Sequence, residues 1–307
     1  MSNTIISQQI WDNKLAQRLD KSQNWKEICD VMYSDSQTIV LPYVSASNEP
    51  AVSTGLFTSA ADRSDVSKVV PPIAITQATE TLQIISTDYD AVYIDYADQA
   101  QSNYARLADL GDLLGKKIGE RIETLTHAQN ALFTNLGDVG AGVVGLGAGA
   151  LTVSATNIDD IIRGIIEQIQ TANGFDFYKQ NGGFVVWRPA DWTFLMQYMQ
   201  ANGFLQADLA LKSGAYTDGA VEAVGVPYMG LYHYVSTLYA TGHLTAGVRK
   251  MLKLGLLKST YGKTYVVENP TATTSGILSG TELYARLDYG YKLQTNVAPL
   301  VFDVNVA

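Results

Sequence analysis

The longest periodic stretch of this chain limits its fold more than any other feature. From Asp98 to Asn135, leucines and isoleucines recur every three or four residues, which predicts one continuous amphipathic helix. The apolar positions are Leu107, Leu110, Leu114, Ile118, Ile122, Leu125 and Leu132. At about 1.5 Å per residue, such a helix would be about 50 Å long, well beyond an average globular helix. The chain must therefore fold around an elongated strut.

An extended, polar stretch precedes the strut. Residues 43–97 are rich in Ser, Thr, Ala and Pro and end in the β-branched and aromatic run "TLQIISTDYDAVYIDYAD". This composition predicts two long strands joined by a polar tip. Because a two-stranded hairpin buries little by itself, we expect a partner surface to stabilise it.

Residues 1–42 are expected to form an arm with short helical pieces. Trp11, Leu15 and Leu19 are spaced four residues apart and therefore share one face of a helix. Asn24 followed by Glu27 predicts a capping box for the helix at "WKEICDVM". The arm has little else to bury, so its apolar stripe is expected to dock on its own body or on a neighbouring copy.

Helices and strands alternate after the strut. Asn157 is the expected N-cap of a helix followed by Gly174, "GGFVVW" predicts a buried strand, and Pro189 begins a second helix ended by Gly203. The run "VEAVGVPYMGLYHYVSTLY" is strand-rich, and the C-terminal residues are expected to return as strands to the core sheet. This order of elements predicts the α+β class.

The glycine run "GDVGAGVVGLGAGAL", residues 137–151, contains the spacing G-x-G-x-x-G of a dinucleotide-binding loop. That loop should follow a strand and open a helix, whereas this run follows a helix and the next helix starts only at Asn157. A membrane-active segment is an alternative, but the run is internal and too short to span a bilayer. We expect an apolar, closely packed or bendable joint.

Enzymatic motifs are absent from the sequence. It contains no H-E-x-x-H, G-x-S-x-G, C-x-x-C or Walker A lysine, and His127, His233 and His243 lie far apart. The single cysteine, Cys29, is expected to be a small apolar residue, and it fits a reducing compartment. We therefore predict no catalytic, cofactor-binding or metal-binding residues, and no cofactor. No apolar run long enough to cross a membrane, and no signal peptide, is evident.

Two charged segments stand out in a chain whose net charge is −9. The acidic edge consists of Asp88, Asp90, Asp95 and Asp98. The basic stretch consists of Arg249, Lys250, Lys253, Lys258 and Lys263, with no acidic residue from 223 to 267. Each could be simply a solvated surface, and the paired aspartates could alternatively bind a divalent cation. The acidic balance argues against tight nonspecific nucleic-acid binding, although not against loose contact through a local patch.

The order of these elements resembles the major capsid protein of tailed bacteriophages, with the Hong Kong 97-type fold. The resemblance is carried by "ICDVMYSDSQTIVLPYVS" leading into the hairpin, by "QSNYARLADLGDLLGKKIGERIETLTHAQNALFTN" as the spine helix, by "FVVWRPADWTFLMQYMQANG" in the peripheral domain and by "VEAVGVPYMGLYHYVSTLY" in the axial domain. It covers nearly the whole chain but lies in pattern and order, without a diagnostic motif. Encapsulin nanocompartments share the fold, but their usual N-terminal sequence is not evident here.

The resemblance implies five regions. They are an N-terminal arm over 1–42, an extended β-hairpin (E-loop) over 43–97, the spine helix, glycine-rich joint and peripheral (P) domain core over 98–203, an axial (A) domain over 204–262, and return strands over 263–307. It further implies hexamers and pentamers closing into an icosahedral shell around double-stranded DNA. A scaffolding protein, a portal and decoration proteins are the implied partners. The implied location is the phage head, assembled in the host bacterial cytoplasm, with no membrane.

The acidic edge and the basic stretch are complementary in sign, and we expect parts of them to meet across a subunit boundary. The arm residues Trp11, Leu15 and Leu19 are further candidates for contacts between subunits. The rival interpretation places the basic stretch against packaged DNA. Two other functions stay open at this point, a nucleotide- or metal-dependent soluble enzyme and another self-assembling virion or tail component.

Overall fold

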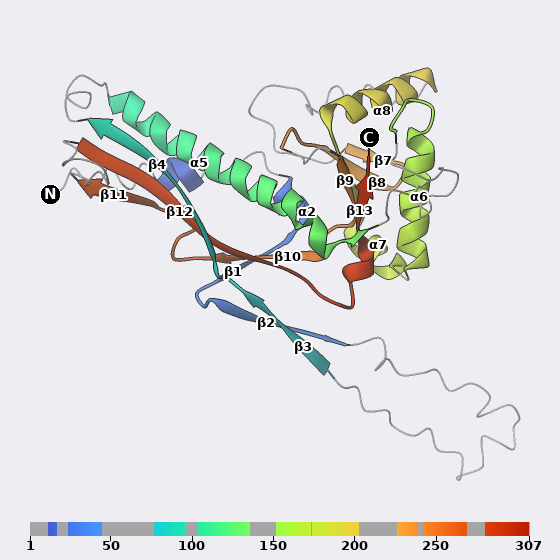
Figure 1. Cartoon of the computed structure of the whole chain (residues 1–307), viewed down its shortest axis with the longest axis horizontal. Coiled ribbons are helices and arrows are strands. Elements are labelled where there is room, and N and C mark those ends of the chain that lie inside the picture. Colours follow the sequence, from blue (N-terminus) through green and yellow to red (C-terminus); the bar gives the residue numbers. More distant parts are fainter. Residues whose placement is uncertain are drawn as a thin grey trace, which may run out of the picture. The chain divides into compact units, whose positions relative to one another are not determined.

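The computed structural model describes nine segments of the chain, and all structural statements below concern these residues. They are 12–16, 24–44, 77–95, 104–135, 152–172, 174–202, 226–238, 242–268 and 280–306. The chain divides into two compact units, one made of Met1–Ile39 and Leu82–Ala307 and the other of Val40–Thr81. Figure 1 shows the elements in chain order.

A five-stranded sheet is built around one long strand, β12 (Gly280–Leu293). On one side, β4 (Ser86–Asp95) pairs antiparallel with its first ten residues. On the other side, β11 (Thr264–Glu268) and β10 (Leu252–Leu257) pair antiparallel with its two halves. The strand β1 (Asp30–Ser34) then adds parallel to β10.

The long helix α5 (Tyr104–His127) lies along one face of this sheet, as Figure 1 shows. Of the predicted apolar stripe, Leu114, Ile118 and Ile122 are buried, whereas Leu132 is 43% exposed. The α-helical part is shorter than the predicted span, because a 3-10 turn, η2 (Ala128–Leu132), follows His127. Residues 98–103 of the prediction lie outside the described residues.

A second sheet has six strands in the order β5-β13-β9-β6-β8-β7. Their bounds are Thr134–Asn135 (β5), Val301–Asn305 (β13), His243–Val248 (β9), Gly183–Trp187 (β6), Leu231–Val235 (β8) and Val226–Tyr228 (β7). The expected buried strand "GGFVVW" lies inside this sheet, and each residue of β6 is buried. The short 3-10 turn η4 (Ala298–Leu300) leads into β13.

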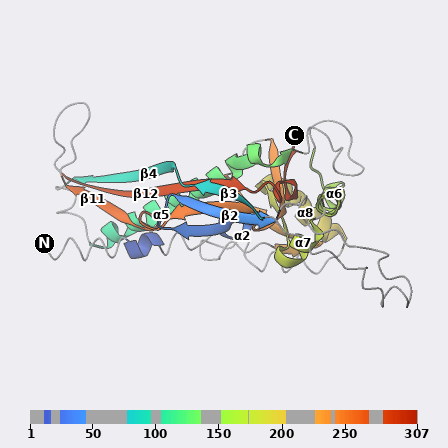
Figure 2. The ribbon, with the colours of Figure 1, turned by 90° about the horizontal axis from the view of Figure 1, so that it is seen from below.

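Three helices accompany the six-stranded sheet, as Figures 1 and 2 show: α6 (Ile158–Thr171), α7 (Phe175–Asn181) and α8 (Pro189–Ala201). The isoleucines of α6 form its buried face, and Pro189 stands at the start of α8 as predicted. The expected end of α8 at Gly203 lies outside the described residues.

Both predicted side-chain caps are wrong. Asn157 precedes α6, but its side chain bonds the preceding turn: Oδ1 accepts from the amide of Ser154, and Nδ2 donates to the carbonyl of Thr152. Asn24 precedes the short helix α2 (Trp25–Ile28), but its amide donates to Glu123 and to the carbonyl of Val235. In both cases a nearby polar group competes successfully with the helix amides.

The predicted second hairpin strand is in fact two strands. Residues Gln77–Gln83 (β3) pair with Thr38–Val44 (β2), whereas Ser86–Asp95 pairs with β12. The break falls at Ile84, whose side chain is buried, and at the exposed Ile85. Because β12 is long enough to pair with all of β4, this half of the segment joins the main sheet instead of the hairpin.

The strands expected over residues 204–262 belong to the two sheets. Of residues 204–262, the described part supplies β7, β8 and β9 to the six-stranded sheet and β10 to the five-stranded one. The return strands expected over 263–307 are present as β11, β12 and β13.

Candidate assembly surfaces

The acidic edge lies on β4, at the border of the five-stranded sheet. Asp88 accepts a hydrogen bond from Nε of Arg121 on α5 at 2.9 Å, so one carboxylate is already paired within the chain. Oδ1 of Asp90 accepts from the backbone amide of Ala91 at 3.1 Å. The side chain of Asp95 and the whole of Asp98 lie outside the description. The proposed role of these residues between subunits stays a prediction.

Most of the basic stretch is bound inside the chain. Arg249 donates from Nε to the carbonyl of Asn181 at 2.7 Å and lies over the ring of Tyr232. Lys253 pairs with Asp30 across 2.6 Å, with its side chain 19% exposed. The Arg249 contact ties the end of β9 to the end of α7, and the Lys253–Asp30 pair joins β10 to β1. The sequence alone did not indicate this structural role.

Lys250 is half-buried, and its ammonium group is bound within the chain. Its Nζ donates to the carbonyl oxygens of Lys26 and Cys29, at the end of α2. Burial lowers the pKa of Lys250 below its ordinary value, while the nearby Cys29 and Asp30 act in the opposite direction. Its backbone φ of 66° lies in the left-handed region that non-glycine residues seldom adopt.

Lys258 and Lys263 are the exposed members of the stretch. The Lys258 side chain is 53% exposed and lies 3.1 Å from Asp35, which is 81% exposed. An exposed ion pair of this kind contributes little to stability and exchanges readily for another partner. If the basic stretch binds a partner, these two lysines are the residues able to do so.

The arm docks on its own chain at the residues that the structure describes. Residues 12–16 are helical, and Leu15 is 1% exposed within the hydrophobic core. Oδ1 of Asp12 accepts from both the amide and the hydroxyl of Thr264 on β11, each at 2.6 Å. Trp11 and Leu19 lie outside the described residues, so their predicted contacts stay predictions.

The outer face of the five-stranded sheet carries tyrosines that sequence reasoning did not single out. Tyr89 and Tyr93 on β4 are 75% and 38% exposed. Tyr265 and Tyr284, on the paired strands β11 and β12, stack with ring centroids 5.1 Å apart. The alternation "TDYDAVYID" places Tyr89 and Tyr93 on the face of β4 opposite to that of Asp88 and Asp90.

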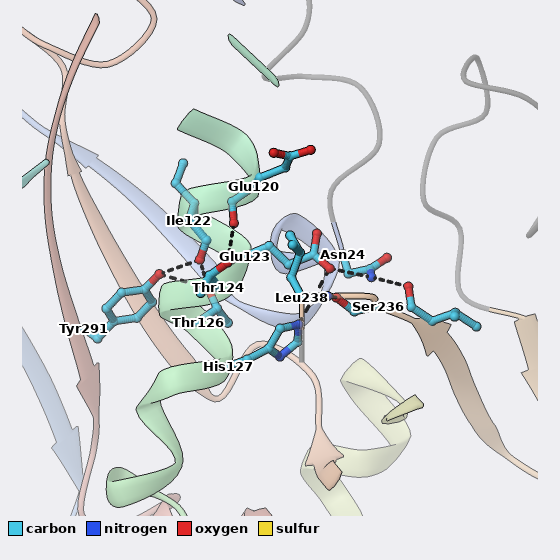
Figure 3. A network of polar contacts seen from close by, with 11 residues as sticks. Asn24, Glu120, Ile122, Glu123, Thr124, Thr126, His127, Ser236, Leu238 and Tyr291 are labelled. Atoms are coloured by element: carbon cyan, nitrogen blue, oxygen red, sulfur yellow. Dashed lines mark hydrogen bonds and ion pairs between the residues drawn. The ribbon is translucent and has the colours of Figure 1, made fainter. Parts of the chain in front are cut away.

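A buried polar network joins α5 to elements from both ends of the chain (Figure 3). Asn24 donates to Glu123 at 3.1 Å, and His127 lies 3.7 Å from the same carboxylate. On the other side of the helix, the hydroxyls of Thr126 and Tyr291 are 2.9 Å apart. These contacts fix the long helix against α2, β8 and β12.

The histidines have structural partners. His233 is buried, with Nδ1 accepting from the indole Nε1 of Trp187 at 2.8 Å and Nε2 against the carbonyl of Tyr228 at 3.0 Å. His243 lies 3.0 Å from Asp303 on β13. Sheet pairing brings this acid to His243, which sequence spacing could not show. Burial raises the pKa of Asp303 and outweighs the opposite effect of His243.

The described residues contain no group of three or more His, Cys, Asp or Glu that could hold a metal ion. Within the same residues, no helix combines the length and apolar character needed to cross a membrane. The glycine run 137–151 lies outside the described residues, so its role as a joint stays a prediction. Cys29 is fully buried, and burial raises its pKa to about 12.

No protein-family model matches the sequence, and no curated protein matches it either. Solved structures, in contrast, match along almost the whole chain. One from Mycobacterium phage Cain shares 14% identity at a TM-score of 0.57, covering 94% of this chain and 90% of that one. The capsid of the cyanophage P-SCSP1u shares 14% identity at a TM-score of 0.50, over 94% and 89% of the two chains. The chain has a phage capsid fold.

A virus-like particle from Pyrococcus furiosus has the same fold, with 9% identity, a TM-score of 0.54 and coverage of 97% of this chain and 98% of that one. The resemblance to phage capsid proteins and the expected α+β class are thereby confirmed at the level of fold.

Proposed function

We propose that this chain is the major capsid protein of a tailed bacteriophage. It assembles into hexamers and pentamers of an icosahedral head that encloses double-stranded DNA. The observation that carries the proposal is the match to phage capsid structures over nine tenths of both chains. A match of this extent supports a likeness along most of the chain and not only in one element.

The architecture of the chain is consistent with a shell subunit. The long helix α5 packs with its buried apolar side chains against a sheet of five strands. In this proposal, α5 is the spine helix of the P domain, the unit Val40–Thr81 is the E-loop, and β7–β10 contribute to the A domain. The E-loop lies across an adjacent subunit. A scaffolding protein, a portal and decoration proteins act as partners during assembly in the bacterial cytoplasm.

The net charge of −9 fits a subunit that contacts packaged DNA only loosely. Tight nonspecific binding relies on many lysines and arginines that neutralise phosphates. Within the basic stretch, Arg249, Lys250 and Lys253 are bound to groups of the same chain, which leaves Lys258 and Lys263 as its exposed cations. The shell therefore encloses the genome without holding it strongly.

The test is expression of the chain with and without a candidate scaffolding protein, followed by size-exclusion chromatography and electron microscopy. Closed icosahedral particles are the expected product. A small monodisperse oligomer under both conditions, together with absence of the chain from purified virions, would overturn the proposal.

A shortened variant provides a matched control for this experiment. Residues 45–76 lie between the paired strands β2 and β3, so a short Gly–Ser turn from Val44 to Gln77 can replace them. The variant should fold, because its larger unit is unchanged, but it should not form particles. Normal particles from this variant would contradict the role given to the E-loop.

The Pyrococcus furiosus particle gives a second candidate, a shell that is not a phage head. Particle contents separate the two functions. Packaged double-stranded DNA in particles from infected cells supports the phage head, whereas a protein cargo supports the second candidate.

A further inference from the structure

Two glycines lie opposite each other in neighbouring strands of the five-stranded sheet. Gly255 is inside β10, and its partner in the antiparallel register is Gly290 of β12. Glycine weakens the interior of a strand, because it loses more conformational entropy on folding and offers no side chain for packing. It often marks a place where another stretch of backbone comes close. A glycine pair at one point of a sheet therefore indicates a close approach.

At Gly290 the approaching group is backbone. A Cβ there would collide with the carbonyl oxygen of Gln83, and it would lie 2.9 Å from the carbonyl carbon of the same residue. Cα of Ile84 would be 3.3 Å away. Because backbone atoms cannot turn aside as a side chain can, a larger residue fits only if residues 83–84 move away from the sheet.

At Gly255 the approaching groups are side chains. A Cβ there would collide with a methyl group of Leu82. Its next neighbours would be Cγ1 of Ile84 at 3.2 Å and Cδ1 of Ile39 at 3.4 Å. These contacts are tight, but side chains have other rotamers to adopt. Glycine is therefore required more strictly at 290 than at 255.

The segment that crosses the glycine pair lies flat on the sheet and is tied down. Leu82 and Ile84 are 1% and 2% exposed, whereas Ile85 is 76% exposed. The amide of Ile84 donates to the carbonyl of Gln37, just before β2, at 2.7 Å. Two residues after Ile84, Ser86 begins the pairing of β4 with β12. The chain thus passes directly from the base of the hairpin into the main sheet.

We propose that Gly255 and Gly290 form a seat that positions the E-loop for assembly. The chain enters the unit Val40–Thr81 from Ile39 and leaves it at Leu82, and the side chains of both residues lie over Gly255. The seat therefore fixes the two points at which the hairpin leaves the sheet.

The inference rests on the proposed function, in which the E-loop lies across an adjacent subunit. Such a contact requires each E-loop to leave its subunit at a defined place. Holding the base of the hairpin in advance lowers the conformational entropy that is lost when subunits associate. The two glycines are positioning residues in this sense, since they act through the segment that they seat.

Alanine at either glycine tests the seat in assembly. Gly290→Ala should lower particle yield by about tenfold or more, because the crossing segment must move off the sheet. Gly255→Ala should lower the yield by only about two- to threefold, since side chains alone must adjust. Lys250→Met is the control for stability, because Lys250 binds carbonyls at the end of α2, and it should assemble normally where it is folded. Normal yield from Gly290→Ala, or an equal loss with Lys250→Met, would overturn the positioning role.

A second substitution separates a collision at the seat from a general loss of stability. Leu82→Ala removes the methyl group with which the new Cβ of Gly255→Ala collides. On a logarithmic scale of yield, Gly255→Ala/Leu82→Ala should therefore lose less than the sum of the two single variants. Leu82→Ala should give Gly290→Ala no such relief, because the backbone of Gln83 stays in place. Additive losses in the Gly255→Ala pair would overturn the seat, and this comparison does not require Gly290→Ala to fold.

Hydrogen exchange in the free subunit tests the seat without particles. In Gly290→Ala, displacement of the segment breaks the hydrogen bond from Ile84 to Gln37. Exchange at the amide of Ile84 should then rise about tenfold more than exchange at Val185 of the central strand β6, which reports on global unfolding. An equal rise at both amides, or no rise at Ile84, would overturn the seat.

These measurements separate the inference from the proposed function. Wild-type particles together with normal yield from Gly290→Ala leave the capsid function in place and overturn the role of the seat. If the wild-type chain forms no particles, the capsid function fails. Faster exchange at Ile84 then supports the glycine pair as the anchor of the hairpin base, whereas unchanged exchange overturns both.

Discussion

Arg121 on α5 donates a hydrogen bond from Nε to Oδ2 of Asp88 on β4, across 2.9 Å. The pair joins the long helix to the border strand of the five-stranded sheet. Because Asp88 is paired within its own chain, it is less available for the contact between subunits that the sequence predicts for the acidic edge. The hypothesis of complementary charge between subunits must therefore be tested at residues without such an internal contact.

The Asp88–Arg121 pair should contribute little to stability. The Arg121 side chain is 50% exposed and that of Asp88 27%. We expect Asp88→Asn to lower the free energy of unfolding by about 1 kcal/mol or less, because water and salt screen an exposed pair. Urea unfolding of D88N, R121M and the double variant measures the coupling. A loss several times larger would show that the pair acts as a buried one.

Lys250, in contrast, should be a stabilising residue of the subunit. Its ammonium binds two carbonyls at the end of α2, and Lys250→Met removes these contacts while keeping the apolar part of the side chain. We expect a loss of about 1.5–3 kcal/mol in unfolding free energy, typical of hydrogen bonds from a charged group. Lys258→Met is the control, because the Lys258 side chain is 53% exposed and its loss should be nearly neutral. Equal effects in urea unfolding would contradict this assignment.

Assembly should depend on the exposed lysines and not on the buried ones. We expect Lys258→Glu/Lys263→Glu to hinder particle formation if the basic stretch meets an acidic surface of a neighbour, with partial rescue by Asp90→Lys. Lys116→Glu/Lys117→Glu makes the same charge change on the exposed face of α5 and serves as the control. Particles that assemble normally but contain little DNA would instead place the stretch against the genome.

The sequence predicts the elements whose burial follows from local periodicity. The stripe of Leu114, Ile118 and Ile122 defines α5, and the apolar run at 183–187 defines β6, because a helix or a central strand needs only its own pattern to be recognised. The chain's resemblance to phage capsid proteins follows from the order of these elements.

Pairing between distant segments is what the sequence does not show. The run from 77 to 95 has a strand-like composition throughout. Its first half, β3, nevertheless pairs with β2, and its second half, β4, pairs with β12. The parallel pairing of β6 with β8 likewise joins two segments that are distant in the sequence. Of the candidate site, the role of the charged segments between subunits stays a prediction, and Lys250 and Lys253 have internal partners that only the fold reveals.

Gly247 should tolerate no side chain. Its φ of 149° lies outside the range that other residues commonly adopt. A Cβ at this position would lie 2.3 Å from the carbonyl oxygen of Leu300 and 2.9 Å from Cα of Val301, both backbone atoms of the neighbouring segment. We expect Gly247→Ala to lower the unfolding free energy by about 3 kcal/mol or more, through strain and displacement of β13. Gly262→Ala, with a Cβ 3.8 Å from its nearest neighbour, is the milder control in the same urea measurement.

His233 should make the subunit sensitive to acid. Burial lowers its pKa from 6.5 to about 4, opposed by the hydrogen bond to the carbonyl of Tyr228. Between these two values the unfolded chain binds a proton that the folded chain does not. The stability is therefore complete above pH 6.5 and falls as the pH decreases, by about 3 kcal/mol at pH 4, where the folded histidine also begins to titrate.

A glutamine at this position separates the histidine from the other titrating groups. In His233→Gln, the amide can accept from Trp187 and donate to the carbonyl of Tyr228, so both hydrogen bonds are kept without a titrating group. Urea unfolding of both proteins at several pH values gives the difference in stability, in which the contributions of carboxylates such as Asp303 cancel. We expect this difference to change by about 3 kcal/mol between pH 7 and pH 4, in favour of the variant at low pH. Parallel curves would mean that His233 takes up its proton in the folded subunit as readily as in the unfolded chain, and that the Trp187–His233–Tyr228 contact does not require the neutral ring.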